Sequence, residues 1–557
     1  MLKIIDLSGA QGATKNLTIY EYKDDIVVVD CGVGFPDSEM LGVDLVIPDM
    51  SYLQDNSHKI RGLIVTHAHE DHLGAVPHFL SEFPNVPVYS SNFCIELLRE
   101  KLQDKERYKD VPRNPSLHVV KSEDDTVDIG VFGLEAFNVN HSVPESLGIV
   151  LRTPEGIVLH MSDFKIDLTP ELDKPIELNK IAAYGDEGVL CLLSDCLKVA
   201  TPGYAPTVKD VGPTFDILFQ EAKGKQLIVT TISSNLSRMY QIMRSAQRMG
   251  RKVVLLGYSI RQKVQVARNL EYIPFDDSFF VDSRNASDYN QADLVYIAAG
   301  SFGQEGSAMD RLSRGENRDI TLESEAHVIF SSTPAPPGVR EPVERMQGRL
   351  SLLDARVIYP GIQDRLHVSG HGPRGDLRLI ASLVKPEYFI PIGGNIIQSQ
   401  SYADMIAELG IDRNRVFSML EGESVEFDKG KAQKGKTYPV KDVYLDGSQI
   451  GDVGPLVLRD REKLSDDGIF VVIVPIDQET RELAGNVEVV TRGFIYVRES
   501  QELMDKTKQS ITDLLQKHEN GLKNWNNVRN EVEKRMQKML YKETGRNPLI
   551  FIQAIYL

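Results

Sequence analysis

The chain has 557 residues, of which 41% are hydrophobic and 26% are charged. One hydrophobic core stops growing at roughly 250–300 residues, so we expect several domains. This composition excludes a disordered, fibrous or membrane-spanning chain. The net charge of -17, taken as a sum, argues against a polyanionic partner such as a nucleic acid.

The cysteines and the first residues indicate the compartment. Four cysteines, Cys31, Cys94, Cys191 and Cys196, are too few for a disulfide framework in a chain of this length. The first sixteen residues lack the basic and apolar stretches of a signal peptide. We therefore expect a cytoplasmic protein with no membrane partner.

Strands and helices are expected to alternate along most of the chain. Apolar runs that end in polar turns predict strands, and longer amphipathic runs predict helices between them. The expected strands include 17–22, 25–32, 62–66, 156–162, 226–233, 252–258, 292–300 and 327–333, and the expected helices include 75–83 and 93–102. This alternation is typical of layered α/β domains, whose functional residues lie where strands end.

The same pass along the chain predicts where the domains begin and end. Residues 1–200 and 366–430 are expected to form one α/β domain, interrupted by a second α/β domain over 201–365. A linker rich in Gly, Lys and Asp is expected over 431–452. Residues 453–557 are expected to form a small α+β domain, with strands around two helices.

A cluster of candidate metal ligands directly follows the expected strand 62–66. The run Thr66-His67-Ala68-His69-Glu70-Asp71-His72 holds three histidines and two carboxylates. Neutral imidazoles and carboxylates are ligands that zinc accepts. One ion would leave several of these ligands unused, whereas two ions would use them.

Further candidate ligands follow other strands. Asp30, His141 and Asp163 each stand at the carboxyl end of a predicted strand, where the sites of α/β proteins are built. A single aspartate in such a position commonly caps a turn. Together with the histidine cluster, the three residues complete a set of ligands.

These residues give the chain a family resemblance. The cluster with Asp30, His141 and Asp163 resembles the metallo-β-lactamase fold, and five further segments resemble ribonuclease J of the β-CASP group. The segments are GAQGATKNLTIYEY, DSEMLGVDLVIPDMSYL, SSNLSRMYQ, SSTPAPPGVREPVERM and HVSGHGPRGDLRLIASLVKPEYFIPI. The resemblance implies a metallo-β-lactamase αββα sandwich, an inserted α/β β-CASP domain and a small α+β C-terminal domain.

The resemblance also implies roles for the site residues. His67, His69 and His141 would bind one zinc ion, Asp71 and His72 a second, and Asp163 would bridge them. Asp30 would orient ligands, and Asp195 and His371 would act near the leaving oxygen. The implied catalytic residues are Asp30, Asp71, Asp195 and His371. Zn²⁺ is the implied ion, with Mn²⁺ or Mg²⁺ as alternatives, and two close cations suit phosphodiester hydrolysis.

The implied activity is hydrolysis of RNA, in its maturation and decay. A pocket for the 5′-monophosphate of an RNA end would favour 5′-to-3′ removal of mononucleotides, with endonuclease activity as an additional expectation. The residues that match the family's pocket are Ser234, Asn235, His367, Ser369 and Gly370. Ser234 and Asn235 also open a predicted helix, and helix starts bind phosphates.

A basic block changes the interpretation of the net charge. Between Ala222 and Leu270 there are ten Lys or Arg residues and no Asp or Glu. Phosphate binding depends on such local charge. From this block we expect Arg238, Arg244 and Arg261 to contact the RNA backbone. An ordinary solvated helix face is the alternative.

Two positions depart from the family pattern. Ribonuclease J usually has Pro-Val-His-Gly where this chain has Pro391-Ile392-Gly393-Gly394, and Gly393 cannot bind a metal. We expect a second metal site that is weakened but retained. Tyr258 stands where the family often has an arginine, which removes one expected RNA contact.

Two alternatives to the ribonuclease remain open. Gly393 favours a weakly active or inactive RNA-binding subunit of a ribonuclease J complex. The metal cluster alone also suits a hydrolase that acts on DNA or on small esters, although such small-molecule enzymes do not need a basic second domain. By resemblance, the C-terminal domain would make a homodimer or homotetramer, and the chain would join an RNA-degradation complex.

Overall fold

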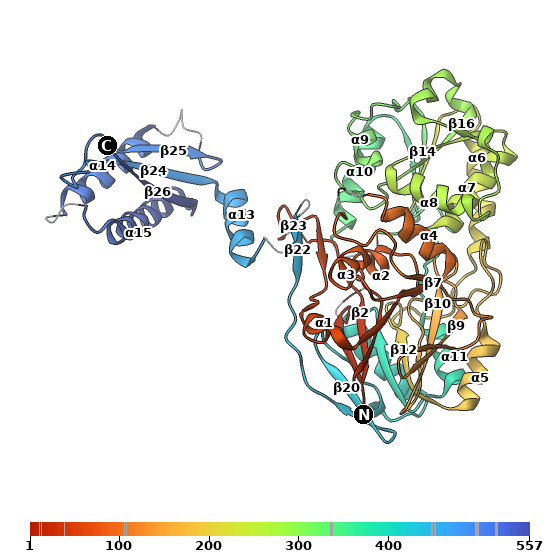
Figure 1. The fold of residues 1–557 in the computed structure, drawn as a ribbon. Helices are drawn as coiled ribbons and strands as arrows, with labels where there is room; N and C mark the ends of the chain where they lie inside the picture. The colour runs from red at the N-terminus through yellow and green to blue at the C-terminus, as the bar shows by residue number, and fades with distance from the viewer. Residues whose placement is uncertain are drawn as a thin grey trace. The chain divides into compact units, whose positions relative to one another are not determined.

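The computed structural model describes residues 1–557 except 11, 13, 38, 105, 107, 335–337, 447–448, 451–452, 496–500 and 519–521, and the side chains of 449 and 450. These residues divide into two compact units. Unit 1 comprises 1–35 and 45–443, and unit 2 comprises 36–44 and 444–557. Figure 1 shows both units as ribbons.

Two mixed sheets face each other in unit 1. The first has the order β21 (Lys431–Lys434), β20 (Ser424–Asp428), β1 (Leu2–Ser8), β2 (Leu17–Tyr22), β3 (Asp25–Val29), β5 (Ile60–Ile64), β6 (Val88–Ser90) and β7 (Leu117–Val119). The second has the order β19 (Tyr388–Ile392), β12 (Val189–Asp195), β11 (Gly156–His160), β10 (Leu147–Thr153), β9 (Phe132–Asn138) and β8 (Val127–Ile129).

Alternating side chains of these strands build two cores. Ile149 of β10 and Leu193 of β12 pack with Ile4 and Val27 of the first sheet. The neighbouring positions point the other way, because successive strand residues face opposite sides of a sheet. Those residues pack against α5 (Leu178–Glu187), α11 (Arg374–Val384) and α12 (Ile396–Glu408). Helices α3 (Val76–Glu82) and α4 (Asn92–Lys101) belong to the part of unit 1 that follows β5 (Figure 1). The result is the expected layered sandwich of helices and sheets.

A third, fully parallel sheet forms the inserted part of unit 1. Its order is β15 (Phe280–Val281), β14 (Lys252–Leu256), β16 (Leu294–Ala298), β13 (Leu227–Thr230), β17 (His327–Phe330) and β18 (Arg356–Ile358). Its helices are α6 (Gly212–Glu221), α7 (Leu236–Arg248), α8 (Tyr258–Asn269), α9 (Ala308–Ser313) and α10 (Arg340–Leu352). Figure 1 shows α9 and α10 on one side of this sheet and α6 and α7 on the other.

Unit 2 holds a small sheet with the order β25 (Glu488–Arg492), β24 (Ile469–Ile476) and β26 (Leu549–Tyr556). Buried residues of α14 (Gln501–Gln516) and α15 (Trp525–Thr544) pack on one face of it. Helix α13 (Pro455–Asp467) precedes β24. The expected strands and two helices of this part are present.

The segment expected to be a linker contains regular structure. Lys431–Lys434 form β21, which pairs antiparallel with β20 and lengthens the first sheet. Within 431–452, residues 447–448 and 451–452 lie outside the described residues. Glycine and lysine content indicates turns, but a short hairpin on a sheet edge contains the same residue types.

Candidate functional site

The histidine cluster lies where β5 ends and the chain turns into the short helix α2 (Glu70–Leu73), whose N-cap residue is His69. Strand β5 pairs in parallel with β3, and β11 pairs in parallel with β12. The carboxyl ends of parallel neighbours lie at one edge of a sheet. Asp30 and Asp163 follow β3 and β11, as predicted, and Asp195 is the last residue of β12.

One group of side chains has the geometry of a metal site. His69 Nδ1 lies 3.2 Å from His67 Nε2 and 3.0 Å from His141 Nε2. Asp163 Oδ2 lies 3.9 Å from His67 Nε2 and 3.7 Å from His141 Nε2. A tetrahedral zinc ion with bonds of about 2.0–2.1 Å keeps its ligand atoms about 3.3 Å apart. The four atoms therefore fit one metal ion.

A second group shares Asp163 with the first. His72 Nε2 lies 3.4 Å from Asp163 Oδ2 and 3.6 Å from Asp71 Oδ2. These three residues could hold a second ion, with Asp163 contributing to both sites.

Asn16 also enters this group, since its Nδ2 atom lies 3.0 Å from His72 Nε2 and donates to the carbonyl of Asp71 at 3.0 Å. Asn16 was not predicted from the sequence, because a single asparagine after an irregular segment carries no distinctive pattern.

Asp30 orients His72 and holds Thr66 through hydrogen bonds. Its carboxylate accepts hydrogen bonds from the backbone N–H of Thr66 at 2.7 Å and from the hydroxyl of Thr66 at 2.9 Å. Its Oδ2 atom also lies 2.7 Å from His72 Nδ1. This contact directs the Nε2 atom of His72 toward Asp163. Carboxylates behind metal-bound histidines fix the ring in this way.

A third group joins Asp195 and His371 to the same carboxylate. His371 Nδ1 lies 2.7 Å from Asp195 Oδ2, and its Nε2 atom lies 4.0 Å from Asp163 Oδ2. The structure therefore brings both residues to the edge of the metal groups. Asp71, Asp195 and His371 all lie in the region expected for the chemistry.

Gly393 lies beside these carboxylates. A Cβ atom added to it would be 3.5 Å from Asp163 Oδ1 and 3.7 Å from Asp195 Oδ1. Its φ of +69° is a conformation that residues other than glycine rarely adopt. A side chain at this position would start beside Asp163, the carboxylate that the metal groups share, and glycine supplies no donor atom there.

The pKa values of the site histidines are shifted in two opposite directions. Burial and neighbouring histidines lower the pKa of His67 and His69 well below its usual value and that of His141 to about 3. These rings are therefore neutral, as metal ligands must be. Burial also disfavours charge on His72 and His371, but carboxylates outweigh it and raise the pKa of His72 well above its usual value. Asp195 and Asp163 likewise raise the pKa of His371 to about 9.

The residues expected to bind a phosphate lie directly before α7 and on the loop 367–371. Asn235 caps α7, accepting a hydrogen bond from the N–H of Arg238 at 3.0 Å. The Ser369 hydroxyl accepts from the N–H of His371 at 3.1 Å. The Gly370 carbonyl lies 2.8 Å from His141 Nδ1. The loop thus connects the phosphate residues to a candidate metal ligand.

Two buried polar atoms near this loop have no partner. Nη2 of Arg238 and Nδ1 of His367 are buried and make no hydrogen bond with the described residues. The rest of the Arg238 guanidinium is bound by Gln241, Ser331 and the Leu366 carbonyl. Each unpaired buried polar group costs about 1–3 kcal/mol, so such atoms point to a ligand.

The structure changes the interpretation of the three arginines expected to contact the RNA backbone. Arg238 is completely buried, so it is not a surface contact. Arg244 forms an ion pair with Glu171 at 2.7 Å. Arg261 lines a separate cavity on α8.

The basic block is likewise less available than its charge count suggests. Lys225 pairs with Glu325, Arg248 with Asp216 and Arg268 with Asp277. Arg251 is buried and donates to three backbone carbonyls. Much of this block therefore stabilises the inserted domain.

Comparisons with known families agree with this architecture. Residues 12–189 match the metallo-beta-lactamase superfamily, residues 224–350 match the beta-CASP domain of ribonuclease J, and residues 456–557 match the ribonuclease J C-terminal domain.

Curated relatives match over nearly the whole chain. Ribonuclease J2 of Bacillus subtilis is 33% identical over 99% of this chain and 97% of its own length. Ribonuclease J 1 of Streptococcus pyogenes is 32% identical over 98% of this chain and 96% of its own length.

A solved structure shares the fold. The crystal structure of a protein of unknown function from Enterococcus faecalis aligns with a TM-score of 0.52 and 15% identity, covering 76% of this chain and 99% of that one. In the part of the chain that the structure describes, no helix is both long and apolar enough to span a bilayer.

Proposed function

This chain belongs to the ribonuclease J family and is a metal-dependent ribonuclease, and from that premise we propose that it degrades RNA from 5′-monophosphorylated ends in the 5′-to-3′ direction. We further propose that it works in cytoplasmic RNA maturation and decay, with internal cleavage as a secondary activity. The proposed domain limits are 1–200 with 366–430, 201–365, and 453–557.

The observation that carries the preference for a phosphorylated end is the buried guanidinium of Arg238. No described carboxylate pairs with it, and burial lowers its pKa to about 9. Burying a cation without a counter-charge costs roughly several kcal/mol of folding free energy. A bound phosphate would supply both the negative charge and the hydrogen-bond acceptors. Ser234, Asn235, His367, Ser369 and Gly370 complete this proposed pocket around the start of α7.

The proposed chemistry rests on three groups of residues. His67, His69, His141 and Asp163 would hold one ion, and Asp71, His72 and Asp163 a second. Zn²⁺ suits these donors best, with Mn²⁺ or Mg²⁺ as the alternatives. Bound ions would supply activation of water and stabilisation of the charged phosphodiester transition state.

The protein's own groups would orient and exchange protons. Asp195 fixes the ring of His371 so that Nε2 faces the shared carboxylate Asp163. In this orientation His371 would donate a proton to the leaving oxygen. Asp30 would hold His72 in the matching tautomer. The loop 367–371 would keep the terminal phosphate at a fixed separation from the reacting bond.

The direct test uses one RNA sequence with 5′-monophosphate, 5′-triphosphate or 5′-hydroxyl ends, and a DNA of the same sequence. Each is incubated with the protein and Zn²⁺, Mn²⁺ or Mg²⁺. We expect mononucleotides from the 5′-monophosphorylated RNA, at least tenfold faster than from the other ends. Equal rates for all ends would overturn the pocket, and faster cleavage of DNA or small esters would favour those substrates.

Gly393 supports a second candidate function. With one donor missing from the second metal group, the chain would be a weakly active or inactive RNA-binding subunit of a ribonuclease J complex. The same assay separates the two functions. Tight RNA binding with no products, and no further change for His67→Ala, is the result expected of such a subunit.

We also propose that unit 2 joins copies of the chain into a dimer or tetramer. On the sheet face away from α14 and α15, Val490, Phe551 and Ile555 are exposed, while Val472, Val474 and Ile552 on the other face are buried. Exposed apolar side chains that share one face favour a protein interface. Such an assembly would be the unit that enters an RNA-degradation complex.

A further inference from the structure

A cavity lies in the inserted domain, beside α8. Its volume is about 630 Å³, within the range of roughly 300–1,000 Å³ that is usual for small-molecule sites. Arg261, Val264, Gln265 and Arg268 line it from one face of α8. Lys263 on the opposite face is buried and lies 3.8 Å from Glu70 of α2. The cavity therefore faces away from the metal groups.

The cavity is built on a parallel β-α-β unit. Strand β14 ends at Leu256, Gly257 is the N-cap residue of α8, and β15 pairs in parallel with β14. Gly257 has a φ of +110°, which allows the tight turn into α8. Ligands of open α/β sheets bind beyond the carboxyl ends of such strands.

An acidic residue marks the end of the second strand. Asp282 directly follows β15 and lines the cavity. In nucleotide-binding β-α-β units, a carboxylate at the end of the second strand accepts hydrogen bonds from ribose hydroxyls. The turn at Gly257 has one glycine, Gly257-Tyr258-Ser259-Ile260, and lacks the repeated glycines that let a pyrophosphate approach the backbone. This combination favours a nucleotide with a single phosphate.

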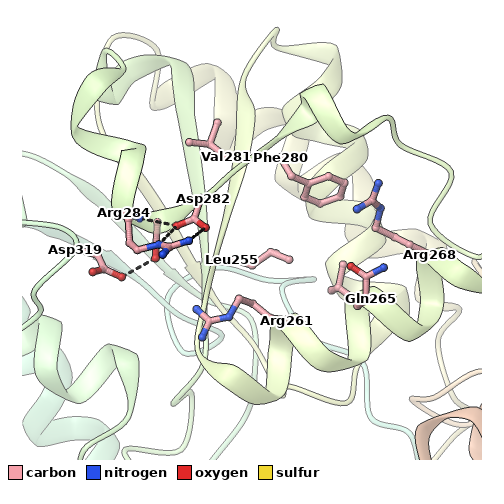
Figure 2. Close-up of a pocket in the computed structure, with 11 residues that line it drawn as sticks. Leu255, Arg261, Gln265, Arg268, Phe280, Val281, Asp282, Arg284 and Asp319 are labelled. Atoms are coloured by element: carbon pink, nitrogen blue, oxygen red, sulfur yellow. Dashed lines mark hydrogen bonds and ion pairs between the residues drawn. The ribbon is translucent and has the colours of Figure 1, made fainter. Parts of the chain in front are cut away.

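The charges in the cavity are divided between paired and unpaired groups. Arg284 forms an ion pair with Asp282, with a nitrogen-to-oxygen distance of 2.7 Å. Figure 2 shows this pair, and it shows no interaction between Arg261 and the other residues drawn. Arg261 makes no ion pair or hydrogen bond through its side chain with the residues that the structure describes. Its guanidinium is thus available to bind a phosphate through two hydrogen bonds.

The remaining lining suits a base and a sugar. Leu255, Val264 and Val281 provide apolar surface. Ser283 donates to Asp319 Oδ2 at 2.6 Å, which leaves the other oxygen of Asp319 as an acceptor in the lining of the cavity. Gln265 offers an amide that can both donate and accept. Apolar lining residues with a few polar groups among them are the arrangement of small-molecule sites.

We propose that this cavity binds a ribonucleoside 5′-monophosphate, with its phosphate on Arg261, its ribose hydroxyls on Asp282, and its base against Leu255, Val264 and Val281. The site is separate from the metal groups and from the pocket around Arg238. It does not depend on the direction of RNA degradation or on the preferred RNA end.

Calorimetric titration of the full, metal-loaded chain with adenosine 5′-monophosphate tests the site. Arg261→Ala is expected to weaken one class of binding at least tenfold, whereas the matched control Arg345→Ala, an exposed arginine on α10 outside the cavity, leaves it unchanged. Hydrogen exchange is expected to slow in α8 and in residues 280–284 when the nucleotide is added. This readout locates the binding independently of any nucleotide held near the metals.

Two further ligands and a conservative variant sharpen the result. The 2′-deoxynucleotide should bind severalfold more weakly than the ribonucleotide to the natural chain, and Asp282→Asn should reduce that difference. The proposal is overturned if exchange in 280–284 does not change, or if Arg261→Ala and Asp282→Asn both bind like the natural chain. Inorganic phosphate that binds as tightly as the nucleotide would also overturn it.

Discussion

His371 and Asp195 form a pair across 176 residues of sequence, with the half-buried His371 Nδ1 2.7 Å from Oδ2 of the buried Asp195. The pair joins the end of β12 to the loop 367–371, and Asp163 lies on its other side. Fixing one nitrogen of the ring leaves the other directed at the reaction site. The pair should therefore act as one unit.

Asp195→Asn is expected to lower kcat by roughly 10²-fold, because the ring of His371 loses the carboxylate that orients it and stabilises its charge. KM for RNA should change little, since Asp195 is completely buried. Steady-state kinetics on 5′-monophosphorylated RNA provide the measurement. Asp210→Asn, in the partly exposed short 3-10 helix before α6, is the matched control. A KM effect alone would contradict this role.

Asp163→Ala should remove metal from both groups, because both share its carboxylate. His72→Ala should remove only the ion bound with Asp71, about half of the metal of a fully loaded chain. Elemental analysis of metal per chain after dialysis measures both. Asp186→Ala, on the exposed surface of α5, controls for the loss of a carboxylate. Equal metal content in Asp163→Ala and in the natural chain would exclude the shared role.

Gly393→His is expected to raise both the metal content and the rate of RNA cleavage, because the added side chain would begin beside Asp163 and Asp195. Gly393→Ala is the control for the backbone, whose φ is +69°. It should cost about 1 kcal/mol of stability and add no metal. No gain in metal or rate for the histidine variant would show that the second site does not depend on this donor.

Asp6 should make the stability of unit 1 depend on pH. Burial, and then the negative charge of Glu421, raise the pKa of Asp6 to about 8 in the folded chain. Its contribution to stability is complete below the unfolded pKa near 4 and is lost as pH rises toward 8. Asp6→Asn should therefore gain stability relative to the natural chain, by roughly 1 kcal/mol or more, between pH 5 and pH 9.

Urea unfolding at these two pH values measures the difference. The exposed residue Asp428 on β20 provides the control Asp428→Asn, which should show no comparable change with pH. If the two variants respond alike to pH, Asp6 does not hold its proton in the folded chain.

Phe551→Glu is expected to reduce the molar mass of the assembly in solution, because it places a charge on the exposed apolar face of β26. Light scattering on the full chain measures the mass. Tyr541→Glu, on the exposed surface of α15, is the control. An unchanged mass for Phe551→Glu would place the interface elsewhere.

Local patterns allowed the strand ends and the histidine cluster to be predicted, whereas the division of the ligands into two metal groups came from the family resemblance. The strands before Asp30, His67 and Asp163 are apolar and short, and the ligands follow them directly. Asn16 could not be predicted, since its contact with His72 depends on how β1, β2 and the intervening segment return to α2.

The availability of the basic block could not be predicted for a related reason. The sequence shows that the positive residues are close to one another along the chain. It does not show that acidic residues from other elements pair with them. Glu171, Asp216 and Glu325 all lie outside 222–270 and pair with arginines or lysines inside it. Arg238, expected at the surface, is buried because α7 turns it toward Ser331 and Leu366.

The loop 367–371 also couples the binding of an anion to the binding of a metal ion. Gly370 holds His141 through its carbonyl, and Ser369 holds the backbone of His371. A Cβ at Gly370 would lie 2.6 Å from the ring of His141, so the loop and the histidine cannot move independently. An anion that orders this loop would also order a metal ligand. By reciprocity, the factor by which metal tightens binding of an RNA end equals the factor by which that end tightens binding of metal.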